Sequence, residues 1–178
     1  MIGIDETRDF KPLNLAILTV SDTRTKENDT SGDTLQSLAE EAGHHVVERK
    51  LTRDSRIGIS DTLISWAAKP GIDVILTTGG TGLTARDVTP EAVRDVMEKE
   101  IEGFGELFRM LSYKTVGTST IQSRAIGALV RGTYVFALPG STGACKDGWN
   151  GILKDQLDSR HRPCNFAELI PRLAKHPT

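Results

Sequence analysis

A glycine-rich stretch from Thr77 to Asp87 combines residue types that proteins use to hold anions. Its centre, Gly79-Gly80-Thr81-Gly82, can bring backbone N–H groups close to a ligand, because glycine has no Cβ and adopts positive φ at little cost. Successive N–H groups of this kind form a nest for anions. A glycine pair alone would indicate only a tight turn, but Thr78, Thr84 and Arg86 add polar groups here. We therefore expect the loop to bind a ligand and to mark the active site.

Two familiar phosphate-binding motifs do not fit this sequence. A P-loop needs a glycine directly before its lysine, and the segment Gly140 to Lys146 (GSTGACK) lacks it. The segment Gly80 to Ala85 satisfies the loose GxGxxA dinucleotide pattern, but the next helix is predicted to begin only at Thr89. No acidic residue ends a strand ~20 residues further on, as that fingerprint requires. These mismatches argue against a nicotinamide-dependent oxidoreductase.

Two carboxylates accompany the glycine loop. Asp87 precedes a predicted helix, where its alternative role is to cap the helix or to favour its dipole by roughly 0.3–1 kcal/mol. Thr89 already fills the cap position, and Pro90 suits the first helical turn. Asp54 alone would be a turn or cap residue, but it leaves the same edge of the predicted sheet as Asp87. Two carboxylates beside a phosphate nest suit magnesium, which prefers oxygen ligands.

Two further segments carry polar groups next to predicted strands. Pro139-Gly140-Ser141-Thr142 is a helix entry with Ser141 as cap, and such an entry also offers free N–H groups to an anion. Ser123 and Arg124 precede a strand, which by itself indicates an exposed strand start. The remaining metal-ligand types show no ligand spacing, so we expect structural or exposed histidines and reduced thiols: His44, His45, His161, His176, Cys145 and Cys164.

The elements that must position these loops alternate between strands and helices. The alternation, and strands that are apolar on both faces, predict an α/β fold with a mostly parallel central sheet covered by helices on both sides. In such sheets ligands bind beyond the carboxyl ends of the strands. Four loops leave that edge: Ser21–Ser31, Thr52–Arg56, Thr78–Asp87 and Pro139–Lys146. The predicted strands are Leu15–Val20, His45–Leu51, Ile72–Thr77, Ala125–Val130 and Tyr134–Leu138, the last two joined at Arg131–Gly132, and the predicted helices are Gly32–Ala42, Ile57–Ala68, Thr89–Glu100, Phe104–Tyr113 and Thr142–Leu157, with a short amphipathic piece at Phe166–Leu173.

Length and composition bound the remaining possibilities. The 178 residues, 38% of them hydrophobic, are enough for one domain over residues 1–178, with a polar N-terminal lead (1–13) and a C-terminal extension (160–178). A net charge of −2 gives no overall basic field for nucleic acid. No signal-peptide pattern and no apolar run of ~18 residues is present, so we expect no membrane partner and a cytoplasmic protein.

The loops together resemble one family. Thr78–Ala92 reads TGGTGLTARDVTPEA, Leu138–Ser141 reads LPGS, and Ser21–Asp22 follow the first predicted strand. From about Leu13 to Leu173 the chain resembles the molybdopterin-binding family of molybdenum cofactor biosynthesis. The long glycine-loop string is specific to this family, whereas PGS alone would say little. Four segments resemble its B subgroup rather than the adenylyltransferases proper: Ser21–Arg24, Asp29–Gly32, Ala137–Lys146 and Arg162–Phe166.

The resemblance implies a fold, an assembly and a set of roles. It implies a three-layer α/β/α sandwich and a homotrimer, or a homohexamer of two trimers. Enzymes of this family join the terminal phosphate of molybdopterin to AMP from ATP and release pyrophosphate. Magnesium near Asp54 and Asp87 would neutralise the triphosphate, and Ser123 matches a family serine next to the reaction centre. By the same resemblance, the substrate-binding residues are Thr78, Gly79, Gly80, Thr81, Gly82, Pro139, Gly140, Ser141 and Thr142, and the nucleotide-binding residues are Ser21, Asp22 and Gly32.

The resemblance leaves two functions open. One is adenylylation of the molybdopterin phosphate with Mg-ATP. The other is a non-catalytic protein that binds molybdopterin or GTP in the same pathway, because B-subgroup proteins need not be catalytic. No side chain that would read a purine edge can be identified, so the sequence leaves ATP and GTP as alternatives.

Overall fold

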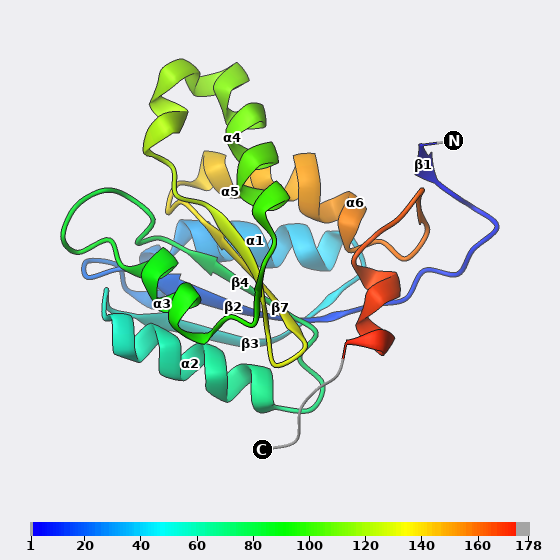
Figure 1. The fold of residues 1–178 in the computed structure, drawn as a ribbon, viewed down its shortest axis with the longest axis horizontal. Coiled ribbons are helices and arrows are strands. Elements are labelled where there is room, and N and C mark those ends of the chain that lie inside the picture. Colours follow the sequence, from blue (N-terminus) through cyan, green and yellow to red (C-terminus); the bar gives the residue numbers. More distant parts are fainter. Residues whose placement is uncertain (1, 174–178) are drawn as a thin grey trace.

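A six-stranded sheet forms the centre of the computed structural model, which describes residues 2–173 (Figure 1). The strands lie in the order β3-β2-β4-β7-β6-β5. The first four run parallel, and β6 and β5 are antiparallel to their neighbours, which confirms a mostly parallel sheet. The strands are β2 (Asn14–Val20), β3 (His45–Thr52), β4 (Val74–Thr78), β5 (Lys99–Glu100), β6 (Ile126–Val130) and β7 (Thr133–Leu138).

Helices cover both faces of this sheet and complete three layers (Figure 1). Alternate residues of β2 face opposite cores: Leu15 and Ile17 pack with one set of helices, and Ala16 and Leu18 with the other. A strand buried on both sides needs such a continuous apolar run. The predicted α/β/α sandwich is therefore confirmed. One layer holds α1 (Thr30–Glu41), α4 (Glu102–Val116), α5 (Thr142–Gly148) and α6 (Lys154–Gln156), and the other holds α2 (Arg56–Ala68) and α3 (Thr89–Val96).

The helix after the glycine loop differs from its prediction at both ends. Val88, not Thr89, is the N-cap residue of α3, and it makes no side-chain capping bond. The Thr89 hydroxyl instead donates to the Gly79 carbonyl oxygen at 2.9 Å, so it closes the glycine loop. The helix ends at Val96 rather than Glu100, because Lys99 and Glu100 pair with β6 as the edge strand β5.

Two other predicted helices also differ in detail. The helix predicted from Gly32 begins two residues earlier, at Thr30, because Asp29 caps it and accepts the Gly32 N–H. The predicted helix Thr142–Leu157 is helical but contains a π-helical turn, η3 (Trp149–Leu153), between α5 and α6. Trp149, Ile152 and Leu153 are all buried and would also share one face of an α-helix, so periodicity cannot distinguish the two.

The two ends of the described chain pack together. β1 (Gly3–Ile4) pairs antiparallel with β8 (His161–Arg162), so the N-terminal lead meets the C-terminal extension. Short 3₁₀ turns complete the fold: η1 (Lys26–Asn28), η2 (Gly117–Gln122) and η4 (Ala167–Arg172), the last at the predicted amphipathic piece. His176 lies outside the described residues, and the single-domain organisation of the whole chain stays a prediction. From residue 2 to 173, no helix is long and apolar enough to cross a membrane.

Candidate active site

The loops that follow the parallel strands meet at one edge of the sheet, as predicted. The Gly79 N–H donates to the Leu138 carbonyl oxygen at 3.0 Å and joins the glycine loop to the end of β7. Arg24 Nη2 donates to the Gly140 carbonyl oxygen at 2.7 Å. This bond links the loop after β2 to the loop Pro139–Ser141, which we call the PGS loop. The Asp54 N–H donates to Asp22 Oδ1 at 3.3 Å. Segments distant in sequence thus form one surface.

Gly79 and Gly80 are required by their backbone conformation and their neighbours. Gly79 has φ of +101° and Gly80 has φ of +65°, both in the region that favours glycine. A Cβ at Gly79 would overlap the carbonyl oxygen of Val20, and one at Gly80 would overlap the Thr89 hydroxyl and lie 2.8 Å from Asp54 Oδ1. The chain can turn at the end of β4, between the neighbouring strands β2 and β7, only because these two residues have no side chain.

The N–H groups at the end of the loop are directed at the carboxylate of Asp87. Asp87 Oδ2 accepts the Thr84 N–H at 2.8 Å and the Thr84 hydroxyl at 2.6 Å. The Thr84 hydroxyl, together with the backbone N–H groups of Thr84 and Gly82, lowers the pKa of Asp87. A Cβ at Gly82 would lie 2.8 Å from Asp87 Oδ2, so glycine lets the carboxylate approach. The protein's own anion therefore occupies this part of the predicted nest.

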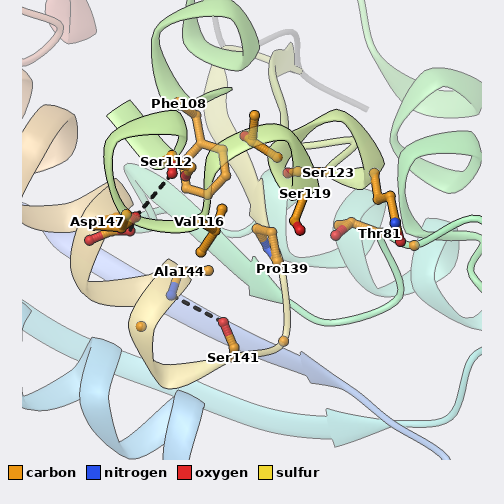
Figure 2. A pocket seen from close by; sticks show the side chains of 16 residues that line it. Thr81, Phe108, Ser112, Val116, Ser119, Ser123, Pro139, Ser141, Ala144 and Asp147 are labelled. Atoms are coloured by element: carbon orange, nitrogen blue, oxygen red, sulfur yellow. Dashed lines mark hydrogen bonds between the residues drawn. The ribbon is translucent and has the colours of Figure 1, made fainter. Parts of the chain in front are cut away.

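A pocket of about 540 Å³ opens beside the glycine loop. This volume falls within the range of small-molecule sites. Thr81 and Gly82 form one side, Pro139, Gly140 and Ser141 another, and Ser123 lies between them on the wall (Figure 2). Six of the predicted site residues thus line one cavity.

The hydroxyl of Ser123 is the unsatisfied polar group of this pocket. Its oxygen is buried and has no hydrogen-bond partner among residues 2–173. A buried hydroxyl without a partner costs roughly 1–3 kcal/mol, so a ligand oxygen placed there would recover a bond. The position fits a group that contacts a bound molecule.

The remaining walls come from residues that the sequence did not identify as functional. Phe108 and Val116 of α4 face the cavity from the side opposite the PGS loop (Figure 2). Asp147 of α5 lies on the same side, where its Oδ2 accepts the Thr115 hydroxyl at 3.4 Å. On a sequence, the spacing of Phe104, Phe108 and Ser112 indicates only the buried face of a helix. The polar run Gly117–Ser123 was the only local signal that this segment does not pack into the core.

The PGS loop is fixed from below by buried groups. Ser141 caps α5 and accepts the Ala144 N–H at 3.1 Å, as predicted. The Thr78 hydroxyl donates to the Pro139 carbonyl oxygen at 3.1 Å and lies 3.3 Å from Cys145 Sγ, so it points beneath the loop rather than into the pocket. Burial raises the pKa of the Cys145 thiol to about 11, which keeps it protonated and without nucleophilic character.

An acidic cluster of Asp22, Asp54 and Asp87 lies on the other side of the glycine loop. The pKa of Asp54 is raised by burial first, and then by the negative charges of Asp22 and Asp87. Arg86 acts in the opposite direction and pairs with Asp22 at 2.9 Å. Asp22 and Asp87 thus lie near enough to Asp54 for their charges to act on it, and the metal-binding role of Asp54 and Asp87 stays a prediction. No three His, Cys, Asp or Glu side chains within residues 2–173 are arranged as a metal site.

Several predicted residues lie away from the pocket lining. Ser21 Oγ accepts the N–H groups of Thr23 and Arg24 and shapes its own loop. Gly32 is buried in the first turn of α1, where a Cβ would collide with Asp29. Thr142 is the first residue of α5. Like Gly79 and Gly80, it is not among the residues that line the pocket. The part of these residues in binding stays a prediction.

Comparison with known proteins agrees with this geometry. Residues 16–159 match the family model described as "Probable molybdopterin binding domain". The molybdenum cofactor biosynthesis protein B of Escherichia coli (strain K12) is 50% identical over 158 residues, which cover 89% of this chain and 93% of that protein.

Solved structures agree as well. A crystal structure of a molybdenum cofactor biosynthesis protein B has a TM-score of 0.85 at 41% identity and covers 93% of this chain and 98% of the other. The tungsten cofactor synthesizing protein MoaB from Pyrococcus furiosus has a TM-score of 0.75 at 35% identity, with 93% and 99% of the two chains covered. These likenesses confirm the family resemblance and the fold.

Proposed function

The chain belongs to the molybdopterin-binding domain family, and from that premise we propose that it binds molybdopterin in the pocket beside Ser123 during molybdenum cofactor biosynthesis. The observation that carries the proposal is the unpaired Ser123 hydroxyl in a cavity bounded by the glycine loop and the PGS loop. A pterin is flat and polar at its edges. The cavity offers apolar surface from Phe108 and Val116 and polar groups from Thr81 and Ser123.

In the reaction we propose, an oxygen of the terminal phosphate of bound molybdopterin attacks the α-phosphorus of ATP. The bond between the α- and β-phosphates breaks, AMP is transferred and pyrophosphate leaves. The Ser123 hydroxyl would donate a hydrogen bond to a phosphate oxygen, and the N–H groups at the start of α5 would face the same negative charge. The nucleotide would lie toward the loop after β2, near Ser21, Asp22 and Gly32. The protein would act mainly by positioning and by neutralising charge.

The acidic cluster fits a magnesium ion through Asp54 better than through Asp87. The raised pKa of Asp54 reflects burial beside Asp22 and Asp87, and a cation would relieve that repulsion. Asp87 already accepts bonds from its own loop. Magnesium often takes only one or two carboxylates and completes its shell with water and substrate phosphates. Bound there, it would neutralise charge on the triphosphate.

A second function is favoured by the hydrogen bonds that Asp87 already accepts from its own loop. Because that carboxylate is held by Thr84 and Gly82, the chain would offer fewer free metal ligands than two aspartates provide. The protein would then bind molybdopterin or GTP without transferring a nucleotide. The proposed compartment in either case is the cytoplasm, where Cys145 and Cys164 would remain the free thiols seen in the structure.

Titration with molybdopterin, followed by an assay with Mg-ATP and with Mg-GTP, tests both functions. Ser123→Ala should weaken molybdopterin binding by about 10- to 100-fold, because a hydrogen bond to a charged group contributes roughly 1.5–3 kcal/mol. Ser119→Ala is the matched control, since Ser119 lines the same pocket but is exposed. Binding without an adenylylated or guanylylated product would favour the non-catalytic function. No binding to the wild-type protein would exclude both functions.

We also propose that the protein assembles as a homotrimer or as a hexamer of two trimers, as the family resemblance implies. Large apolar side chains on α4 and η2 support an interface there: Met110 and Tyr113 are each 58% exposed, and Ile121 is 80% exposed. Apolar groups gathered on one helix and the turn after it are typical of contact surfaces. Light scattering coupled to size-exclusion chromatography would distinguish the monomer from either assembly.

A further inference from the structure

Arg124 makes an unusual set of contacts behind the glycine loop. Its Nε donates to the Gly82 carbonyl oxygen at 2.9 Å, and its Nη2 donates to the Asp87 carbonyl oxygen at 2.7 Å. Its backbone N–H donates to the Thr81 carbonyl oxygen at 3.3 Å. Nη1 forms an ion pair with Glu91 on α3. One residue thus holds the middle and the last residue of the loop, and the helix that follows it.

The segment between the two carbonyl groups that Arg124 holds is exposed, and Arg86 ties it to the loop after β2 through Asp22. Residues 83–86 are all exposed, and Leu83 is 69% exposed despite its apolar side chain. Arg124 itself is largely covered, with 26% of its side chain exposed. A planar guanidinium can donate in several fixed directions at once, which an ammonium cannot do. The contacts to Gly82 and Asp87 therefore depend on arginine.

The position of Arg124 in the chain connects this clamp to the pocket. It directly follows Ser123, which lines the pocket and whose buried hydroxyl has no partner among the described residues. Thr81 and Gly82, which it holds through their carbonyl oxygens, are also pocket residues. Movement of the loop away from Arg124 would change the spacing between Ser123 and the loop side of the cavity.

We propose that Arg124 is a positioning residue that holds the glycine loop at the distance from Ser123 at which a pterin phosphate can contact both. This inference rests on the proposed binding of molybdopterin, and it adds a residue that touches no ligand itself. The ion pair with Glu91 orients the guanidinium, and the two carbonyl contacts transmit that orientation to the loop.

Hydrogen exchange and molybdopterin titration of the same variants test the inference. Arg124→Ala should speed exchange of the amides of residues 82–88 by about tenfold or more, because this segment loses its two carbonyl contacts with the guanidinium. It should also weaken molybdopterin binding by about tenfold, because a displaced loop misplaces its donors. Arg124→Lys should lie between the wild type and Arg124→Ala in both exchange rate and affinity. A lysine keeps a charge for Glu91 but cannot donate to both carbonyl oxygens together.

Arg56→Ala is the matched control. Arg56 also pairs with α3, through Asp95 at 2.5 Å, and its side-chain hydrogen bonds within residues 2–173 go to Asp95 rather than to the glycine loop. It should leave both loop exchange and binding within about twofold of wild type, because exposed ion pairs contribute little. Hydrogen exchange is measured without a ligand, so it tests the contacts of Arg124 independently of the proposed molybdopterin binding.

The possible outcomes are distinct. Faster loop exchange in Arg124→Ala with unchanged molybdopterin affinity would overturn the inference, as would unchanged exchange. If Arg124→Ala fails to fold, Arg124→Lys decides by the same two readouts, and unchanged values there would also overturn it. Failure of the wild-type protein to bind molybdopterin would contradict the proposed function, while the exchange data would still report on the clamp.

Discussion

Two aspartates that look equivalent in the sequence have opposite environments in the structure. Hydrogen bonds from Thr84 and Gly82 lower the pKa of Asp87, so the loop stabilises its ionised form. Burial and the charges of Asp22 and Asp87 raise the pKa of Asp54, so its ionised form is disfavoured. Asp87 therefore organises the loop, whereas the negative charge of Asp54 is not balanced by the groups around it. A carboxylate in such an unfavourable environment is a candidate for a functional role.

Asp54→Asn should stabilise the ligand-free protein, because it removes a carboxylate whose ionised form is disfavoured in the fold. Because the pKa of Asp54 is raised on folding, its cost is absent below the ordinary value of 3.8 and is complete once pH exceeds the raised value. The unfolding midpoint should rise by ~1–3 °C at pH 7. At pH 3 the gain should disappear, and thermal denaturation at both pH values measures the difference.

The control for this experiment is Asp61→Asn, an exposed aspartate of α2. It should change the midpoint by less than ~1 °C at either pH, since surface substitutions have small effects. A lower midpoint for Asp54→Asn at pH 7 would show that Arg86 and its neighbours stabilise the Asp54 carboxylate, contrary to this account.

Six of the residues predicted for the site line one cavity, but the contacts among them could not be predicted from the sequence. Thr81, Gly82, Ser123 and the PGS residues line one pocket because their loops leave the same edge of the sheet. The role of Arg124 was not visible, because a residue before a strand has no local signal for a partner 42 positions away. Phe108 was equally hidden, since an aromatic residue in a helix is typical of the core.

At the scale of elements, the glycine loop depends on the strands on either side of it. Gly79 lies against Val20 at the end of β2 and bonds to Leu138 at the end of β7. The turn after β4 thus packs closely between the ends of β2 and β7, the neighbours of β4 in the sheet. Close packing of three strand ends is what brings their loops into one site.

Gly79→Ala should therefore be severely destabilising. An alanine at φ of +101° is strained, and its Cβ would overlap the Val20 carbonyl oxygen. We expect a loss of about 2–4 kcal/mol in the free energy of unfolding, measured by urea denaturation. Gly143→Ala is the control, because a Cβ there meets open space and alanine favours the helix by up to ~1 kcal/mol. Equal losses in the two variants would contradict the packing argument.

The elements themselves were largely predictable, and their spatial order was not. Short apolar runs and helical periodicity marked β2, β4, α1 and α2 to within about two residues. The antiparallel edge strand β5 was missed because Lys99 and Glu100 continue a helical pattern and pair only through backbone groups. Such pairing depends on β6, which lies further along the chain.

At the scale of the whole molecule, the N-terminal lead is fastened across the end of the fold. Besides the pairing of β1 with β8, the Ser159 hydroxyl donates to the Asp9 carbonyl oxygen and accepts the Lys11 N–H, both at 2.9 Å. Buried His44 lies beneath this closure. Its Nδ1 accepts the Leu13 N–H at 3.2 Å, and its ring contacts the rings of Phe10 and Trp149.

His44 should make the stability of this closure depend on pH. Burial lowers the pKa of His44 from 6.5 to about 4, although the charge of Asp158 opposes the shift. Because the folded pKa lies below the unfolded one, the stabilisation is complete above pH 6.5 and is lost as the pH falls toward 4. The loss attributable to this one group is about 3 kcal/mol. Urea denaturation at pH 7.5, 6, 5 and 4 measures it.

His44→Asn isolates this effect, because an amide oxygen can accept the Leu13 N–H but does not titrate. The variant should be less stable than wild type at pH 7.5, since it loses the contacts with Phe10 and Trp149. Its stability should nevertheless fall less steeply between pH 6.5 and 4, so the two curves should converge in acid. Parallel curves for wild type and His44→Asn would show that other groups cause the acid sensitivity and that the closure over the N-terminal lead is not controlled by His44.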